Sequence, residues 1–225
     1  MAFLQSQPPR QPFLNAPPVV LWLIAAFVAI HVATVAAPGI VTDDALLRYA
    51  FVPARYSQGA SPFELAVPLI SHMFLHGSWL HLTVNCLWFL AFGPIIARRY
   101  GATLFLLFFF VCGIAGALTY LALNWGSPEP VIGASGGISG LMAAGIRLLR
   151  WPNVRPWHDL APILSRPVVM FTTFWLVANF VLAVMGVGAG EEMQQVAWQA
   201  HLGGFACGLF LINAMELLRE RRPLA

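Results

Sequence analysis

The sequence predicts an all-α polytopic membrane protein with six transmembrane helices and a first loop that is partly embedded in the membrane. Of the 225 residues, 59% are hydrophobic and only 9% are charged, whereas soluble domains carry about a quarter charged residues. The chain also contains six apolar stretches close to the roughly 20 residues that cross a bilayer core as helix. This composition provides no polar coat for water, so the expected solvent is lipid.

The composition also limits the partners and cofactors. All twelve basic residues are arginine, and the net charge is only +3, so the charge gives no indication of nucleic-acid binding. The three cysteines, Cys86, Cys112 and Cys207, each lie within an apolar run. We expect them to be small buried side chains rather than a disulfide framework.

The first three spans are long apolar runs. VVLWLIAAFVAIHVATVAA (residues 19–37) is the first. The second (79–97) follows Ser78, a residue type that favours the helix N-cap. The third is TLFLLFFFVCGIAGALTYLAL (103–123).

The last three spans contain more small or polar residues. They are expected at residues 132–150, 168–185 and 196–218. The whole membrane domain then covers 17–218, between a flexible cytoplasmic tail at 1–16 and a cytoplasmic C-terminal tail at 219–225.

The arginines predict the orientation of the spans, because basic residues stay preferentially on the cytoplasmic side. With both termini cytoplasmic, ten arginines fall in inner segments, and only Arg48 and Arg55 fall in outer loops. The inner ones are Arg10, Arg98, Arg99, Arg147, Arg150, Arg155, Arg166, Arg219, Arg221 and Arg222. We expect a multi-pass protein of a cell membrane, of the prokaryotic plasma-membrane kind.

The segment LAVPLISHMFLHG (65–77) is apolar but would make the second span far too long. Pro68 and Gly77 interrupt it. We expect it to form part of a loop packed on the bundle, because irregular backbone at membrane depth needs protein or water around it.

Polar residues inside the spans indicate a functional site, because they are costly in lipid. The depths of four of them can be compared by counting helical residues from the inner arginines. At 1.5 Å per residue, His81 lies about 26 Å above Arg98, and His201 about 27 Å above Arg219. Measured from Arg150, Ser135 lies at about 23 Å but Ser139 only at about 17 Å. Ser135, rather than Ser139, therefore shares the level of the histidines.

This constellation suggests nucleophilic catalysis. A serine hydroxyl needs a base, and His201 is the candidate for Ser135. The backbone N–H of Ser135 and the side chains of His81 and Asn85 are candidates to stabilise an oxyanion. The spans contain no carboxylate at this depth, so a Ser–His dyad is expected. Glycines on the fourth and sixth spans favour close helix packing there. They are Gly133, Gly136, Gly137 and Gly140, facing Gly204 and Gly208.

Together, the motifs resemble the rhomboid intramembrane serine proteases. The resemblance rests on HMFLHGSWLHLTVNCLWFLAFG (72–93), VIGASGGISG (131–140) and AWQAHLGGFACG (197–208), in that order and spacing. FVPAR (51–55) and GALTY (116–120) add to it. The resemblance covers roughly residues 17–217 and implies a rhomboid-like helix bundle.

The resemblance also implies the roles of the site residues. Ser135 corresponds to the nucleophile and His201 to the general base, while His81 and Asn85 correspond to the oxyanion-stabilising pair. Gly133 corresponds to a glycine that lines the same site. The implied substrates are single-pass transmembrane proteins in the lipid bilayer, docking between the second and fifth spans, without a metal or organic cofactor.

At Ser139 some members of the family carry an aromatic residue that packs on the catalytic histidine. This chain lacks that ring. Trp198 and Phe205 are the expected candidates to restrain His201 instead.

Two alternative functions remain. The first is a metalloprotease or a metal transporter that uses His72, His76 and His81. His72 and His76 have the i, i+4 spacing of zinc ligands, but no nearby glutamate supplies the base of a His-Glu-x-x-His site. The second alternative is an inactive relative that binds transmembrane segments. Such relatives usually lose the serine or the histidine, and this chain keeps both.

Overall fold

The computed structural model describes residues 15–36, 47–150, 159–185 and 197–220. Most of the expected N-terminal tail (1–14) and the last residues of the C-terminal tail (221–225) lie outside the described residues. The helices are α1 (Pro18–Ala36), α3 (Ala54–Ser57), α4 (Pro62–Ala66), α5 (Pro68–Ser71), the 3₁₀ turn η1 (His72–Phe74), α6 (Trp79–Leu123), α7 (Ser135–Leu148), α8 (Arg166–Met185) and α9 (Trp198–Glu220). Among these described helices, α1, α6, α8 and α9 are long and apolar enough to cross a membrane. The all-α prediction is confirmed.

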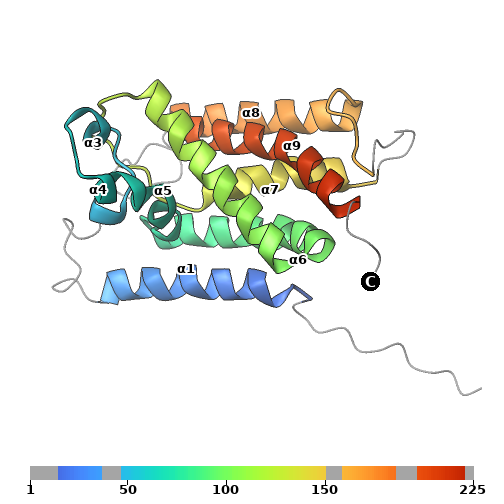
Figure 1. Cartoon of the computed structure of the whole chain (residues 1–225), viewed down its shortest axis with the longest axis horizontal. Coiled ribbons are helices and arrows are strands. Elements are labelled where there is room, and N and C mark those ends of the chain that lie inside the picture. Colours follow the sequence, from blue (N-terminus) through green and yellow to red (C-terminus); the bar gives the residue numbers. More distant parts are fainter. Residues whose placement is uncertain (1–14, 37–46, 151–158, 186–196, 221–225) are drawn as a thin grey trace, which may run out of the picture.

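Helix α6 contains both the second and the third expected spans. Its 45 residues would extend about 68 Å as one straight helix, more than twice the bilayer core. Gly101 breaks it with a positive φ of 80°, a conformation that glycine adopts at little cost. The two arms therefore run in different directions (Figure 1). The Ser78 hydroxyl accepts from the His81 N–H at 3.1 Å, as expected of an N-cap.

Helix α7 is shorter than predicted. It was expected over 132–150 but forms over Ser135–Leu148, only 14 residues. Every residue from Gly136 to Arg147 is buried, because α7 packs between α6 and α9 in the middle of the bundle (Figure 1). A helix that is surrounded by protein does not need the full length of a lipid-facing span.

Helices α1 and α8 lie on the outside of the bundle, on opposite sides in the view of Figure 1. Only Val20, Phe27 and His31 are buried on α1, and only Val168 and Trp175 are buried on α8. The other apolar side chains of these two helices are either exposed or only partly buried. These exposed apolar faces match the lipid environment that the composition predicts.

The first loop folds into short helices that gather at one end of the bundle (Figure 1). Ser61 and Glu64 form a capping box at the start of α4, and the hydrogen bonds from Ser61 hold the pKa of the Glu64 carboxyl below its usual value. His31 Nδ1 lies 3.0 Å from the carbonyl oxygen of His76. The ring of His31 thus ties α1 to this loop.

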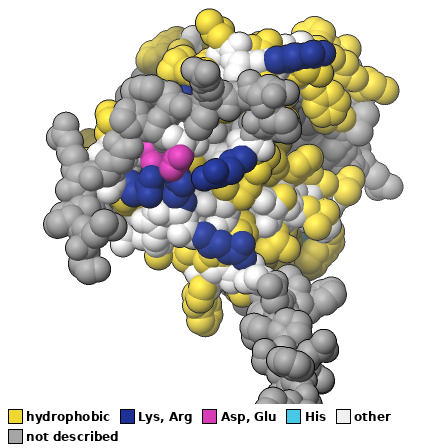
Figure 2. Space-filling view, turned by 90° about the vertical axis from the view of Figure 1, so that its right-hand side faces the viewer, with side chains coloured by type: hydrophobic (Ala, Val, Ile, Leu, Met, Phe, Trp, Pro, Cys, Tyr) yellow, Lys and Arg dark blue, Asp and Glu magenta, His cyan; other side chains and the backbone are white. Residues whose placement is uncertain are grey.

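The opposite end of the bundle carries most of the described arginines. Glu216 is fully buried and accepts hydrogen bonds from Arg99, Tyr100 and Arg219, which ties α9 to α6. Arg147 is also buried, and its guanidinium donates to the Leu209 and Ala161 carbonyls. Figure 2 views this end, where basic side chains surround acidic ones.

Candidate active site

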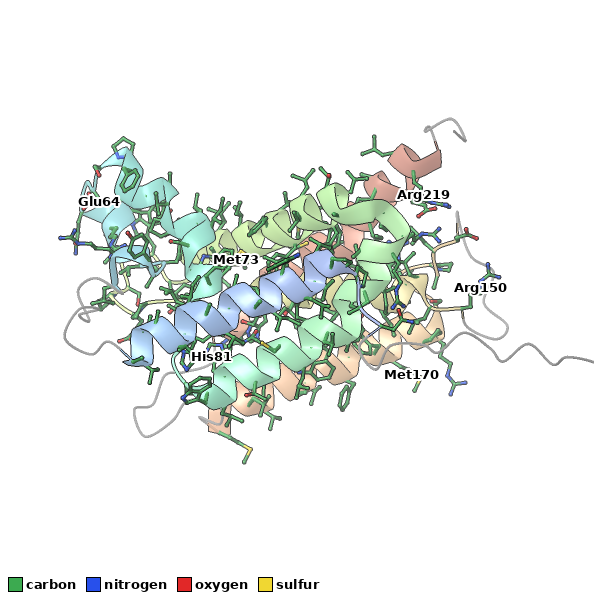
Figure 3. All side chains as sticks on the ribbon, turned by 90° about the horizontal axis from the view of Figure 1, so that it is seen from below. Glu64, Met73, His81, Arg150, Met170 and Arg219 are labelled. Atoms are coloured by element: carbon green, nitrogen blue, oxygen red, sulfur yellow. The ribbon has the colours of Figure 1, made fainter. Side chains whose placement is uncertain are left out.

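Ser135 and His201 lie side by side, although 66 positions separate them in the chain. Ser135 is the first residue of α7, and His201 lies in the first turn of α9. Their Oγ and Nε2 atoms are 2.7 Å apart. Both side chains are partly exposed. Figure 3 shows His81 well away from Arg150 and Arg219, which lie at the other end of the bundle.

Glycines make this approach possible, because α7 and α9 meet backbone to backbone. A Cβ on Gly204 would collide with the Gly136 carbonyl, and a Cβ on Gly208 with the Gly140 carbonyl. These four residues form what we term the glycine seam. Their facing arrangement agrees with the sequence-based expectation.

Two other glycines were expected to face α9 but do not. A Cβ on Gly137 would lie 2.6 Å from the Phe109 ring and 2.8 Å from the Met73 methyl carbon. Gly137 therefore packs against α6 and η1. Gly133 precedes α7 and lies against His81. The physical reason is the helical repeat: residues one position apart point about 100° apart, so Gly136 and Gly137 face different neighbours.

Gly133 lies between His81 and Ser135. A Cβ at this position would be 2.7 Å from His81 Nε2 and 3.8 Å from Ser135 Oγ. The backbone here has a φ of 114°, and its N–H donates to the His72 carbonyl at 2.8 Å. Only glycine fits both the space and the backbone conformation. The absence of a side chain at Gly133 therefore lets His81 and Ser135 both lie close to its Cα.

Asn85 is buried one turn below His81. Its Nδ2 donates to the His81 carbonyl at 2.9 Å. This hydrogen bond stays within α6 and does not reach Ser135. An amide nitrogen carries two N–H groups, and this bond uses one. The expected oxyanion role of Asn85 therefore depends on the second N–H.

Ser139 is buried one turn deeper than Ser135. Its hydroxyl donates to the carbonyl of Ser135 at 2.7 Å. Serines inside helices commonly make such bonds to the preceding turn. The hydroxyl that faces a histidine is therefore that of Ser135.

The other nitrogen of His201 is also engaged. Its Nδ1 lies 2.6 Å from Asn179 Oδ1, on α8. The aromatic candidates for restraining the ring are placed differently, since Phe205 stacks on Trp175 with centroids 4.3 Å apart. Trp198 is 36% exposed. An amide therefore contacts His201 where an aromatic ring was expected.

The loop histidines do not form a metal site among the described residues, which bring together no group of three His, Cys, Asp or Glu side chains suited to a metal ion. His72 Nδ1 lies 2.7 Å from the Pro68 carbonyl oxygen. His72 and His76, the two histidines with the spacing of zinc ligands, are both buried. The hydrogen bond between His76 and His31 uses the backbone carbonyl of His76 and not its ring.

A family model decides which family this site belongs to. The model, described as the rhomboid domain, matches residues 64–216. The chain belongs to the rhomboid family. The matched region of this rhomboid chain begins in the first loop and contains the serine, both site histidines and the glycine seam. With its apolar helices, the chain is a multi-pass membrane protein.

Several curated relatives are similar to this rhomboid chain. The rhomboid protease GlpG of Serratia proteamaculans is 28% identical over 197 residues, which cover 88% of this chain and 62% of the relative. RHOMBOID-like protein 5 of Arabidopsis thaliana is 24% identical, with 91% and 72% covered. The rhomboid protease GluP of Bacillus subtilis is 26% identical, with 66% and 26% covered. The chain thus spans less than two thirds of the GlpG and GluP relatives.

Sequence reasoning missed Asn179, although a signal was present. An asparagine in the middle of the apolar run 168–185 is costly in lipid, and such a residue suggests a function by default. The run 168–185 contains neither serine nor histidine, so no candidate nucleophile or base drew attention to it. The contact with His201 follows from the packing of α8 on α9.

Proposed function

We propose that this rhomboid protein is an intramembrane serine endopeptidase that cleaves membrane-protein substrates with Ser135 as nucleophile and His201 as general base. The observation that carries the proposal is the 2.7 Å contact between Ser135 Oγ and His201 Nε2. A serine paired with an imidazole is the minimal activated nucleophile of acyl transfer. The printed names of the GlpG and GluP relatives, both called proteases, support the same reaction class.

The reaction uses groups of the chain itself. His201 Nε2 takes the Ser135 proton while Oγ attacks the carbonyl carbon of the peptide bond. The imidazolium then gives its proton to the amine that leaves as the C–N bond breaks. His201 next takes a proton from a water molecule while the water oxygen attacks the acyl carbon. The imidazolium then gives this proton to Ser135 Oγ as the bond between Oγ and the acyl carbon breaks.

The oxyanion of each tetrahedral intermediate needs hydrogen-bond donors. The first N–H groups of a helix have no partner within the helix, and Ser135 begins α7. The positive end of the α7 dipole favours negative charge at the same place. His81 lies against Gly133, close to Ser135, and is the proposed side-chain donor, together with the second N–H of Asn85.

The proposed substrates are single-pass membrane proteins whose transmembrane segment approaches from the lipid between the first arm of α6 and α8. Helical segments must unwind to expose a peptide bond to Ser135. The arginine-rich end that holds Arg98, Arg99 and Arg219 is proposed to be cytoplasmic. Cleavage then takes place toward the outer face of a cell membrane, and both termini are cytoplasmic.

The test compares the wild-type protein with Ser135→Ala and His201→Ala in liposomes, using a fluorescent transmembrane substrate and a fluorophosphonate label. Both variants should lose cleavage by at least about 10⁴-fold, because the two residues act as one unit. Ser139→Ala is the matched control and should keep labelling at Ser135. Wild-type protein that neither cleaves nor labels would instead support a protein that only binds transmembrane segments.

The pH dependence tests the base. Labelling should fall once the pH is low enough to protonate His201, because a protonated imidazole cannot accept the Ser135 proton. Labelling that stays constant down to the pH at which the protein unfolds would contradict His201 as the base.

A further inference from the structure

Asn179 connects His201 to α8 through two hydrogen bonds, and only one choice of donors and acceptors satisfies both of them. Asn179 Nδ2 donates to the Trp175 carbonyl at 2.8 Å, and a carbonyl oxygen only accepts. This bond orients the amide so that Oδ1 faces His201, 2.6 Å from Nδ1. Since Oδ1 also only accepts, Nδ1 must carry a proton.

The protonation of Nδ1 determines the state of the other ring nitrogen. A neutral imidazole with a proton on Nδ1 has a lone pair on Nε2, and Nε2 lies 2.7 Å from Ser135 Oγ. The Ser135 hydroxyl is therefore the donor of that bond. This is the tautomer that a general base needs, and the opposite tautomer would point a proton at the nucleophile.

We propose that Asn179 is the positioning residue of His201, so that a chain Trp175 carbonyl–Asn179–His201–Ser135 takes the place of a simple dyad. Asn179 Oδ1 accepts a hydrogen bond from the Nδ1–H of His201 and so fixes the plane of the ring. It keeps this bond when Ser135 loses its proton and His201 becomes an imidazolium. The amide is neutral, so it orients the base without placing a carboxylate in the membrane. This inference rests on the proposed protease function and adds a residue to it.

The surroundings of Asn179 argue against a purely structural role. The neighbouring residues Val177 and Phe180 are 56% and 60% exposed and apolar, so a leucine would suit the position better in lipid. Position 139 provides no ring, and the Ser139 hydroxyl is bonded to the Ser135 carbonyl. Among the residues that the structure describes, Asn179 is thus the hydrogen-bond partner of His201 Nδ1.

Three variants separate positioning from packing. Asn179→Leu keeps the approximate size and removes the acceptor. Asn179→Asp keeps an acceptor oxygen and removes the donor to Trp175. Phe180→Leu changes an exposed neighbour on the same helix and is the matched control.

The rate of fluorophosphonate labelling of Ser135 and the kinetics of a transmembrane substrate are measured for each variant, together with thermal stability. Asn179→Leu should label about 100-fold more slowly, the cost of a misplaced catalytic group. Its kcat should fall with little change in KM, and its Tm should be unchanged or higher. Asn179→Asp should label faster than Asn179→Leu. The fall of its labelling rate at acidic pH should begin at a higher pH than in the wild type, because a carboxylate stabilises the imidazolium. Equal labelling of Asn179→Leu and wild type would overturn the proposal.

A second readout does not require catalysis. The ¹⁵N chemical shifts of His201 in histidine-labelled protein report which ring nitrogen carries the proton. The wild-type ring should be the Nδ1–H tautomer at neutral pH, and Asn179→Leu should populate both tautomers. A wild-type protein that shows this tautomer but does not label would refute the protease function and leave the positioning contact intact. A mixed wild-type tautomer would refute the positioning role, whether or not the protein cleaves substrates.

Discussion

The glycine seam between α7 and α9 and the contact between α8 and α9 hold the same histidine in opposite ways. In the seam, backbone meets backbone, and there is no room for a Cβ on Gly204 or Gly208. Helix α8 instead buries only Val168 and Trp175 among its described residues. It reaches α9 through long side chains, with Trp175 stacked on Phe205 and Asn179 bonded to His201.

The difference separates the distance between Ser135 and His201 from the orientation of the imidazole ring. The seam sets how close the backbones of Ser135 and His201 lie. Two backbones packed in direct contact can move little relative to each other. The orientation of the imidazole depends on a helix that mostly faces lipid. A change in the seam should therefore cost the fold, whereas a change in α8 should cost the chemistry first.

Gly204→Ala tests the seam and should have the largest effect on stability. The new methyl group would meet the Gly136 carbonyl, so α7 and α9 must separate. Overpacking of this kind costs about 1–3 kcal/mol, and more where backbone must move. We expect a lower Tm in detergent and strongly reduced labelling of Ser135.

Gly93→Ala is the matched control for the seam, because a Cβ there would lie 3.4 Å from a Val20 methyl group, an ordinary contact. It should keep both stability and labelling. A stable, fully labelled Gly204→Ala protein would show that the seam can open without separating Ser135 from His201.

Trp175→Ala tests α8 and should have an intermediate effect. The ring stacks on Phe205, and such aromatic pairs contribute about 0.5–1.5 kcal/mol beyond the area they bury. We expect a modest fall in Tm and slower labelling, but less slowing than in Asn179→Leu, because the amide is still present. Phe174→Ala, at a position 72% exposed on the same helix, is the control. Unchanged labelling in Trp175→Ala would show that Asn179 reaches His201 without this packing.

Ser139→Ala should have the smallest effect. It removes one hydrogen bond to the Ser135 carbonyl, worth about 1 kcal/mol, and alanine's higher helix propensity offsets roughly half of that. Thermal unfolding should change by a few degrees at most, and labelling should persist. Loss of labelling would mean that the hydroxyl one turn below Ser135 takes part in the chemistry.

The fold was largely predictable because lipid imposes a strong constraint on sequence. The bounds of α1, α8 and α9 agree with the apolar runs to within a few residues, and Ser78 caps α6 as expected. Helix α7 is shorter than its predicted range, by three residues at its start and two at its end. A central helix is bounded by its neighbours rather than by the bilayer, and the apolar run contains no information about those neighbours.

The sequence by itself determined the all-α class of the protein, its long apolar helices and the shared level of Ser135, His81 and His201, because hydropathy and helical rise act along one chain. Tertiary structure alone decided which glycines form the seam, that Gly133 borders His81, and that Asn179 bonds to His201. These features depend on the rotation of one helix against another. That rotation is set by side-chain packing between segments far apart in the chain, which a linear pattern does not record.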